Sequence, residues 1–279
     1  SRLTVNLKTV GSDIARSQKC DSVIQEIIYN LFNQEVKVEF VDASDLVDEI
    51  KAVKSEDELV YVMKALKLHD MIAAAMPSLI RPGRYEYEVR TDINRILANH
   101  GSEEQLVMMG SAPNGTRTPH LHSFFQNRRI GEGDDVLVMV EVNGPGGYYC
   151  EITRTWCLGE PSKHLLDAWE MAKKVQHYTA SLIKPGVRAC DVREKANEFL
   201  VNHGLPPEER LLAHGQGYDL VERPSLAPAD TMTFKENMVI AIHPTVANEH
   251  AFAMCCDNYL GTAEGAKLLQ KTPQEVIVI

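Results

Sequence analysis

The chain has 279 residues, of which 44% are hydrophobic, and this is enough for one large domain or for a large and a small one. Its formal net charge of −10 and its pI near 5.5 argue against nucleic acid or an anionic membrane as a partner, because both bind a basic surface. The six cysteines have no zinc-ribbon spacing, and no apolar run is long enough to span a bilayer. We therefore expect a cytoplasmic protein with reduced thiols that acts on a small molecule.

The first 46 residues are predicted to form a strand, a helix and a strand, with the sequences "RLTVNL", "DSVIQEIIYNLFNQ" and "VKVEFVDAS". One βαβ unit has too few strands for an independent sheet, so we expect residues 1–46 to be the remnant of a smaller α/β amino-terminal domain. The acidic run "DASDLVDEIKAVKSEDEL" is expected to be a solvated linker and a helix start. Residues 55–279 are expected to form a second, larger domain.

A long amphipathic helix is predicted to begin near the N-cap residue Ser55, and part of it belongs to a repeat. The stretches "SLIRPGRYEYEVRTDINRILANHG", from Ser78, and "SLIKPGVRACDVREKANEFLVNHG", from Ser181, are identical at 12 of 24 positions without a gap. In each, "RPG" or "KPG" ends one helix and a second helix follows. Gly101 and Gly204 are expected to end these second helices in the left-handed conformation.

Strand-like stretches follow each helix pair. They are "QLVMMG" and "DDVLVMVEV" in the first half, and "RLLAHG" and "MVIAIHP" in the second. The chain therefore contains two α-α-β-β halves, and an internal duplication explains the ungapped identity better than convergence of two helical hairpins. We expect an α+β fold in which the sheets of the two halves join, with a ligand site between the halves.

Five motifs from about Val41 to Ile279 resemble those of the creatinase, prolidase and aminopeptidase P superfamily, in the order and spacing of that family. They are "VDASDLVDEIKAVKSEDEL", "PNGTRTPHLHSFFQNRRIGEGD", "GYYCEITRTWCLG", "AHGQGYDLVERP" and "FKENMVIAIHPTV". The resemblance implies the pita-bread fold of this superfamily. It also implies a homodimer, because the amino-terminal domain of family members often reaches over the partner's site.

Peptidases of this family hold two divalent metal ions with two aspartates, one histidine and two glutamates. The resemblance places the first aspartate at Val140 or Glu141, depending on a one-residue gap, and Glu141 is preferred. It places Glu151 at the second aspartate, His214 at the histidine, and His243 and Cys256 at the glutamates. Because four of the five ligands are replaced, we expect no two-metal centre and no cofactor. The alternative is one divalent ion, zinc or iron, held by Glu151, His214 and His243, with Cys256 or Glu141 as a further ligand.

The superfamily also contains creatinase, which cleaves a C–N bond of creatine without a metal. Glu151 resembles the glutamate that holds the cationic substrate of creatinase, and His122 occupies the position of its proton-shuttling histidine. We therefore predict His122 as base and then acid, and Glu151 and Glu141 as substrate anchors. His214 and His243 are predicted to donate hydrogen bonds or to stabilise charge. Creatine itself is not expected as the substrate, because creatinase has a carboxylate where this chain has His243.

Three further residues are candidates for substrate contact. His120 lies on the same side of an extended segment as His122 and is the alternative proton shuttle. Arg154, in "EITRTW", either contacts the substrate or pairs with a carboxylate beneath the site. Cys256 either lines the site or is a buried strand residue, and the sequence pairs no base with it as a nucleophile.

These observations predict a creatinase-like hydrolase that cleaves a C–N bond of a small nitrogen-containing metabolite. One alternative is an Xaa-Pro dipeptidase or aminopeptidase with an altered or mononuclear metal site. The other is a non-catalytic binding module on the same fold, since sites rather than folds determine function.

Overall fold

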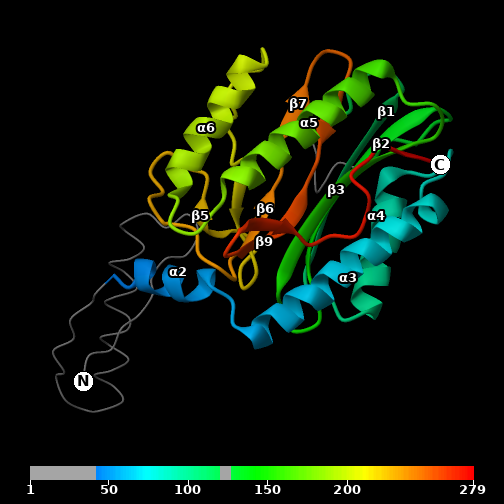
Figure 1. Ribbon diagram of the computed structural model, residues 1–279. Coiled ribbons are helices and arrows are strands. Elements are labelled where there is room, and N and C mark those ends of the chain that lie inside the picture. Colours follow the sequence, from blue (N-terminus) through cyan, green and yellow to red (C-terminus); the bar gives the residue numbers. More distant parts are fainter. Residues whose placement is uncertain (1–41, 120–126) are drawn as a thin grey trace, which may run out of the picture. The chain divides into compact units, whose positions relative to one another are not determined.

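The computed structural model describes residues 42–119 and 127–279, and Figure 1 shows how their helices and strands are arranged. The chain divides into two compact units, residues 1–51 and 52–279. The βαβ remnant predicted for residues 1–46 lies almost wholly outside the described residues. No helix of the described part is both long and apolar enough to cross a membrane.

The prediction of a solvated linker after residue 41 is wrong in part, because helix α2 occupies Ser44–Ala52. The Asp42 carboxylate accepts a hydrogen bond from the backbone N–H of Ser44 at 2.9 Å, where the helix begins. Asp45 lies in the first turn and Lys51 in the last, and both charges are favourable for the helix dipole.

Helix α3 spans Glu56–Leu79, and its start confirms the predicted N-cap. The side chain of Ser55 accepts from the backbone N–H of Glu58, and the Glu58 carboxylate accepts from the N–H of Ser55 at 2.7 Å. This reciprocal pair is a capping box. Helix α4, Glu86–Asn99, follows after the predicted turn.

The second helix pair, α5 (Lys163–Leu182) and α6 (Ala189–Asn202), ends in the same way as the first. His100 and His203 close α4 and α6, and each ring Nδ1 lies 2.8 Å from a backbone oxygen four residues earlier. Gly101 and Gly204 follow with φ of 90° and 76°, which is the left-handed conformation predicted for them. The two halves of the duplication therefore share the same arrangement of residues at the ends of their second helices.

The first half contributes a four-stranded sheet in the order β1-β2-β3-β11. Its strands are β1 (Gln105–Pro113), β2 (Asp134–Asn143), β3 (Tyr149–Cys157) and β11 (Ile277–Val278). Apolar residues of α3 and α4 pack against β1, β2 and β3 to form one core cluster, which includes Ile72, Ile93, Val138 and Trp156.

The second half contributes a five-stranded sheet in the order β10-β9-β6-β4-β5 and a separate pair, β7 and β8. The strands are β4 (Ala213–Gly215), β5 (Glu222–Ser225), β6 (Val239–Ile242), β7 (Thr245–Ala247), β8 (Phe252–Met254), β9 (Asp257–Thr262) and β10 (Gly265–Leu268). The strand predicted for "RLLAHG" is shorter than expected. The backbone N–H of Arg210 donates to the Glu208 carboxylate at 3.0 Å instead of to a neighbouring strand.

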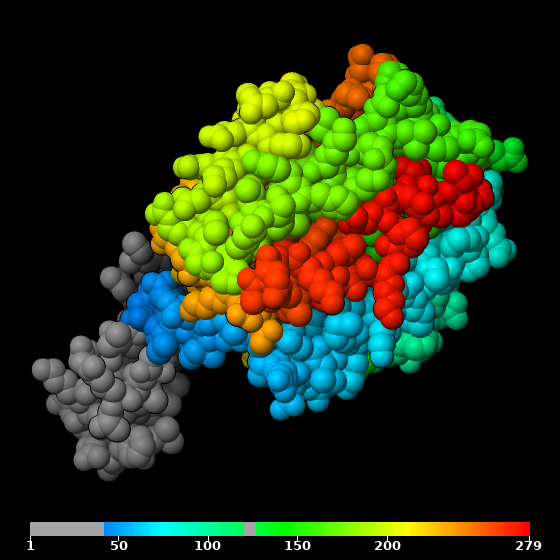
Figure 2. All heavy atoms as spheres, viewed as in Figure 1, coloured from blue at the N-terminus to red at the C-terminus, as the bar shows by residue number. Residues whose placement is uncertain are grey.

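The two halves are joined at β3 and by the C-terminal segment. The N–H of Thr153 donates to the carbonyl of Cys256 at 3.3 Å, which links β3 to the start of β9. Figure 2 shows the C-terminal segment, in red, running between α5 and α3. Its Thr272 donates to Asp70 of α3 at 2.9 Å, and Trp169 of α5 donates to the carbonyl of Gln274 at 3.3 Å.

Candidate functional site

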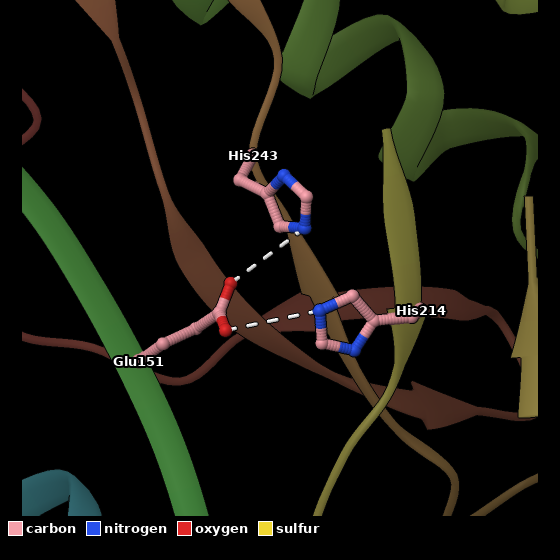
Figure 3. Close-up of side chains that lie close together, drawn as sticks. All are labelled: Glu151, His214 and His243. Carbon is pink, nitrogen blue, oxygen red and sulfur yellow. Dashed lines mark ion pairs between the residues drawn. The ribbon is translucent and has the colours of Figure 1, made fainter. Parts of the chain in front are cut away.

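One carboxylate and two imidazoles meet where the two halves join (Figure 3). Glu151 lies on β3 of the first half, His214 on β4 of the second, and His243 directly after β6. Each offers one ligand atom, and these atoms all lie within 4.8 Å of one another. Glu151 is 0% exposed, His214 4% and His243 6%, so the three side chains are shielded from bulk water.

Strand pairing accounts for the meeting of the two histidines. His214 lies opposite Ala241 in the ladder of β4 and β6, and the N–H of His243 donates to the carbonyl of Leu212 at 3.0 Å. Residues opposite each other share a face of the sheet, as do residues two apart on one strand. Both rings therefore project from one face, with their centroids 5.1 Å apart.

Both imidazoles direct their Nε2 atoms at the Glu151 carboxylate. The Nδ1 of His214 donates to the carbonyl oxygen of Gly215 at 2.8 Å, so Nε2 is the ring nitrogen that faces Glu151. Burial lowers the pKa of His243 to about 4, although the nearby Glu151 raises it, so this ring is neutral at pH 7. Within the described part of the chain, the Nδ1 of His243 is buried without a hydrogen-bond partner.

Glu151 is held ionised by its surroundings. Burial raises the pKa of this carboxyl, but His214, His243 and the hydrogen bonds from Cys256 and Gln216 outweigh burial and keep the pKa below its ordinary value. Oε1 accepts from the Cys256 thiol at 2.9 Å, and Oε2 accepts from the Gln216 amide at 3.0 Å.

The donor set fits a single divalent ion. The Nε2 atoms of His214 and His243 lie 3.8 and 3.9 Å from Glu151 oxygens, which is too far for a hydrogen bond. Two ligands of one tetrahedral ion, with bonds of about 2.1 Å, would lie roughly 3.4 Å apart. Two imidazole nitrogens and a carboxylate at such separations can serve together as ligands of one divalent ion. The expectation that no metal binds is therefore not supported by the geometry.

Glu141 also lies at this site, but its carboxyl group differs in protonation from that of Glu151. It is the residue opposite Glu151 in the ladder of β2 and β3, so the two side chains share a face. Burial and then the charge of Glu151 raise the pKa of Glu141 to about 8, whereas Arg210 lowers it. Glu141 is therefore protonated at pH 7.

The structure contradicts the prediction that Arg154 contacts substrate. Its side chain is fully buried, and its five N–H donors are all used within the protein. Nη2 donates to Asp257 at 2.6 Å and to the carbonyl of Thr272 at 3.1 Å. Nη1 and Nε donate to the carbonyls of Thr153, Cys256 and Pro273. No donor is left for a ligand, so Arg154 is a structural residue, as the alternative interpretation expected.

Of the remaining predicted residues, Cys256 lies in the site, whereas His120 and His122 lie outside the described residues. The Cys256 thiol is fully buried, and burial, followed by the charge of Glu151, raises its pKa well above the ordinary value. It is therefore a protonated hydrogen-bond donor to Glu151. The predicted roles of His120 and His122 remain predictions.

Three residues that contact Glu151 directly were missed from the sequence: Gln216, Asn258 and Gln270. Only Gln216 had a usable signal, because it lies two residues after His214 in "AHGQG". Asn258 and Gln270 are 107 and 119 positions from Glu151, and no local pattern links them to it.

Comparison with known proteins identifies the class to which this fold and site belong. The sequence pattern of metallopeptidase family M24 matches residues 61–265. The chain is 30% identical over 240 residues to a protein of Mycobacterium tuberculosis named "Probable dipeptidase PepE", covering 85% of this chain and 63% of that protein. It is 27% identical over 242 residues to the Xaa-Pro dipeptidase of Pyrococcus furiosus, covering 86% and 69%. The chain therefore belongs to metallopeptidase family M24.

Solved structures confirm the predicted fold. Dipeptidase PepE from Mycobacterium ulcerans has a TM-score of 0.78 and 25% identity, over 97% of this chain and 70% of that one. The prolidase from Pyrococcus horikoshii has a TM-score of 0.81 and 23% identity, over 99% and 76%. This chain therefore has the pita-bread fold of the creatinase, prolidase and aminopeptidase P superfamily. The chain spans just under two thirds of the length of the mycobacterial sequence relative.

Proposed function

We propose that this chain is a hydrolase of an amide C–N bond in a dipeptide or a dipeptide-like small molecule, and that it works with one divalent ion. The observation that carries the proposal is the convergence of Glu151, His214 and His243 within 4.8 Å. Two histidines and one carboxylate form a ligand set used by hydrolytic zinc enzymes. The names of the relatives, dipeptidase and Xaa-Pro dipeptidase, support the bond class.

Each residue of the site has a chemical role in this proposal. Glu151, His214 and His243 would hold the ion, which when bound supplies a Lewis acid for a water molecule and for the scissile carbonyl. Cys256 and Gln216 donate hydrogen bonds that keep the Glu151 carboxylate oriented and ionised. Glu141, protonated at neutral pH, is placed beside Glu151 to give a proton to the leaving nitrogen.

The creatinase-like reaction without metal, which the sequence favoured, receives no specific support. In that reaction Glu151 would bind a substrate cation, but it is 0% exposed. A single metal ion is small enough to lie among the ligand atoms of Glu151, His214 and His243, which are within 4.8 Å of one another. We therefore prefer the peptidase reaction with an altered metal centre.

The test combines metal analysis with a substrate screen. Protein purified without chelator should hold close to one equivalent of zinc, manganese, cobalt or iron per chain. It should hydrolyse at least one member of a panel of Xaa-Pro and other dipeptides, presented beside guanidino, ureido and cyclic amidine compounds. Chelator should abolish turnover, and added metal should restore it.

A matched pair of variants tests the assignment of the ligands. His243→Leu should lose the ion and the activity. His203→Leu removes an exposed helix-capping histidine and should keep both. Two equivalents of metal, or full turnover in chelator, would contradict the proposal. Metal binding without hydrolysis of any compound would favour the binding-module alternative.

A further inference from the structure

Three amide side chains surround Glu151 and bond to its backbone N–H, its backbone carbonyl and one of its two carboxylate oxygens. Asn258 accepts from the Glu151 N–H at 2.8 Å, and Gln270 donates to the Glu151 carbonyl at 2.8 Å. Gln216 donates to Oε2 of the carboxylate at 3.0 Å. Gln216 and Asn258 are 0% exposed and Gln270 is 6% exposed, so water does not compete for these bonds. The three amides come from β9 and from segments following β4 and β10.

Asn258 is also bonded to both Gln216 and Gln270. Together with the bonds to Glu151, these hydrogen bonds close a cycle. Asn258 Nδ2 donates to Gln216 Oε1 at 2.7 Å, and Gln216 Nε2 donates onward to the carboxylate. The backbone N–H of Asn258 donates to Gln270 Oε1 at 2.7 Å. The second N–H of Gln216 donates to the carbonyl of Leu220 at 3.0 Å. Because Oε1 of Gln216 must accept from Asn258, its Nε2 is the atom that faces Glu151.

No other strong donor in the described part of the chain holds the carboxylate. Cys256 donates to Oε1, but a thiol is a weak donor. The two imidazoles lie 3.8 and 3.9 Å away and form no hydrogen bond with it. The orientation of the ligand oxygens therefore depends on Gln216 and on the amides that fix Gln216.

We infer that Gln216 is a positioning residue: through the amide cycle it aims the Glu151 carboxylate at His214 and His243, and it thereby sets the affinity of the site for a divalent ion. This inference rests on the proposed function for its metal. Partners of this kind around a metal ligand typically change metal affinity 10- to 100-fold when they are removed.

The chain provides a control of the same residue type. Gln176 of α5 is likewise 0% exposed, and its Nε2 donates to Ile242, Cys255 and Asp257 at 3.0 to 3.1 Å. None of its hydrogen bonds goes to Glu151, His214 or His243. Gln216→Met and Gln176→Met remove the same amide from equally buried positions, and both should lower the melting temperature.

The experiment is a titration of metal-free protein with Co²⁺, followed by its visible absorption and by calorimetry. Gln216→Met should weaken Co²⁺ binding roughly 10- to 100-fold, whereas Gln176→Met should stay within about threefold of wild type. Gln270→Met, at the outer edge of the cycle, should weaken binding in the same direction by less. It serves as the second variant if Gln216→Met does not fold. Unchanged affinity in Gln216→Met, or an equal loss in Gln176→Met, would overturn the inference.

A crystal structure of metal-free Gln216→Met separates this inference from the proposed function. We expect the Glu151 carboxylate to rotate away from at least one of the two histidines. If wild-type protein bound no Co²⁺, the single-ion proposal would fail, and this structure would still decide the inference. A carboxylate that keeps its wild-type orientation in the variant would refute positioning by Gln216.

Discussion

Glu141 and Glu151 are directly opposite each other in the antiparallel ladder of β2 and β3, and their side chains leave the same face of the sheet. The two carboxyl groups carry different charges because their neighbours differ. Glu151 faces two imidazoles and accepts two side-chain hydrogen bonds, so its pKa is lowered. Burial and the charge of Glu151 raise the pKa of Glu141 to about 8. A pair of acids with separated pKa values is a common arrangement for acid–base work.

Replacing Glu141 by Gln should change how stability depends on pH. The folded-state pKa of Glu141, about 8, exceeds the ordinary 4.5, so its contribution to stability is complete below about pH 4.5 and is lost as pH rises through 8. In chelator-treated protein, the free energy of unfolding of Glu141→Gln relative to wild type should therefore rise by about 2 to 4 kcal/mol between pH 5 and pH 9. Urea unfolding at both pH values measures this, with the exposed Glu103→Gln as control. Parallel pH profiles for wild type and Glu141→Gln would contradict the assignment.

Replacing Arg154 by Met should destabilise the fold without changing substrate recognition. The variant leaves Asp257 buried at 0% exposure without its cation, and losing one partner of a buried pair costs about 3 to 5 kcal/mol. Thermal unfolding measures the loss. The control Arg188→Met removes an exposed ion pair with Asp191 and should have little effect. A raised KM in correctly folded Arg154→Met would restore the predicted substrate contact.

Two glycines of the hairpin between β2 and β3 should respond differently to Ala. A Cβ on Gly144 would lie 2.6 Å from the Cα of Ala65, so α3 would have to move away from the hairpin. We expect Gly144→Ala to cost about 3 kcal/mol, at the upper end of overpacking effects. Gly147 has no atom within 4 Å of a Cβ and a φ of +85°, so Gly147→Ala should cost only about 1 kcal/mol of backbone strain. Equal unfolding midpoints for the two variants would show that α3 yields easily at this contact.

Cys256 should act as a hydrogen-bond donor and not as a nucleophile. Its buried thiol has a raised pKa and donates to Glu151 at 2.9 Å. Cys256→Ser keeps a donor and should retain turnover within about tenfold, whereas Cys256→Ala should weaken metal binding. Among the described cysteines only Cys190 is partly exposed, so peptide mapping after brief iodoacetamide treatment should find it modified before Cys150, Cys157, Cys255 and Cys256. Rapid alkylation of Cys256 with parallel loss of turnover would support a thiol nucleophile.

The sequence alone determined the local structure and the repeat. The capping box at Ser55 and Glu58 and the left-handed glycines Gly101 and Gly204 were predictable, because each depends on residues within a few positions of one another. The duplication predicted two helix-and-sheet halves, and the family resemblance placed Glu151, His214 and His243 at ligand positions. Helix α2 was not predicted because its nine residues are short and strongly charged, a composition that is also typical of a solvated linker.

Tertiary structure alone decided what the polar residues do. Glu151 and His243 are 92 positions apart, and only the joining of β3 to the second half brings their side chains to 3.9 Å. The sequence could not show that Arg154 uses all five donors internally, because its partners lie 102 to 119 positions further along the chain, apart from the adjacent Thr153 carbonyl. The amide cycle around Glu151 was likewise invisible. A hydrogen bond requires atoms within about 3 Å, and for residues so distant in sequence only the packing of both sheets sets that distance.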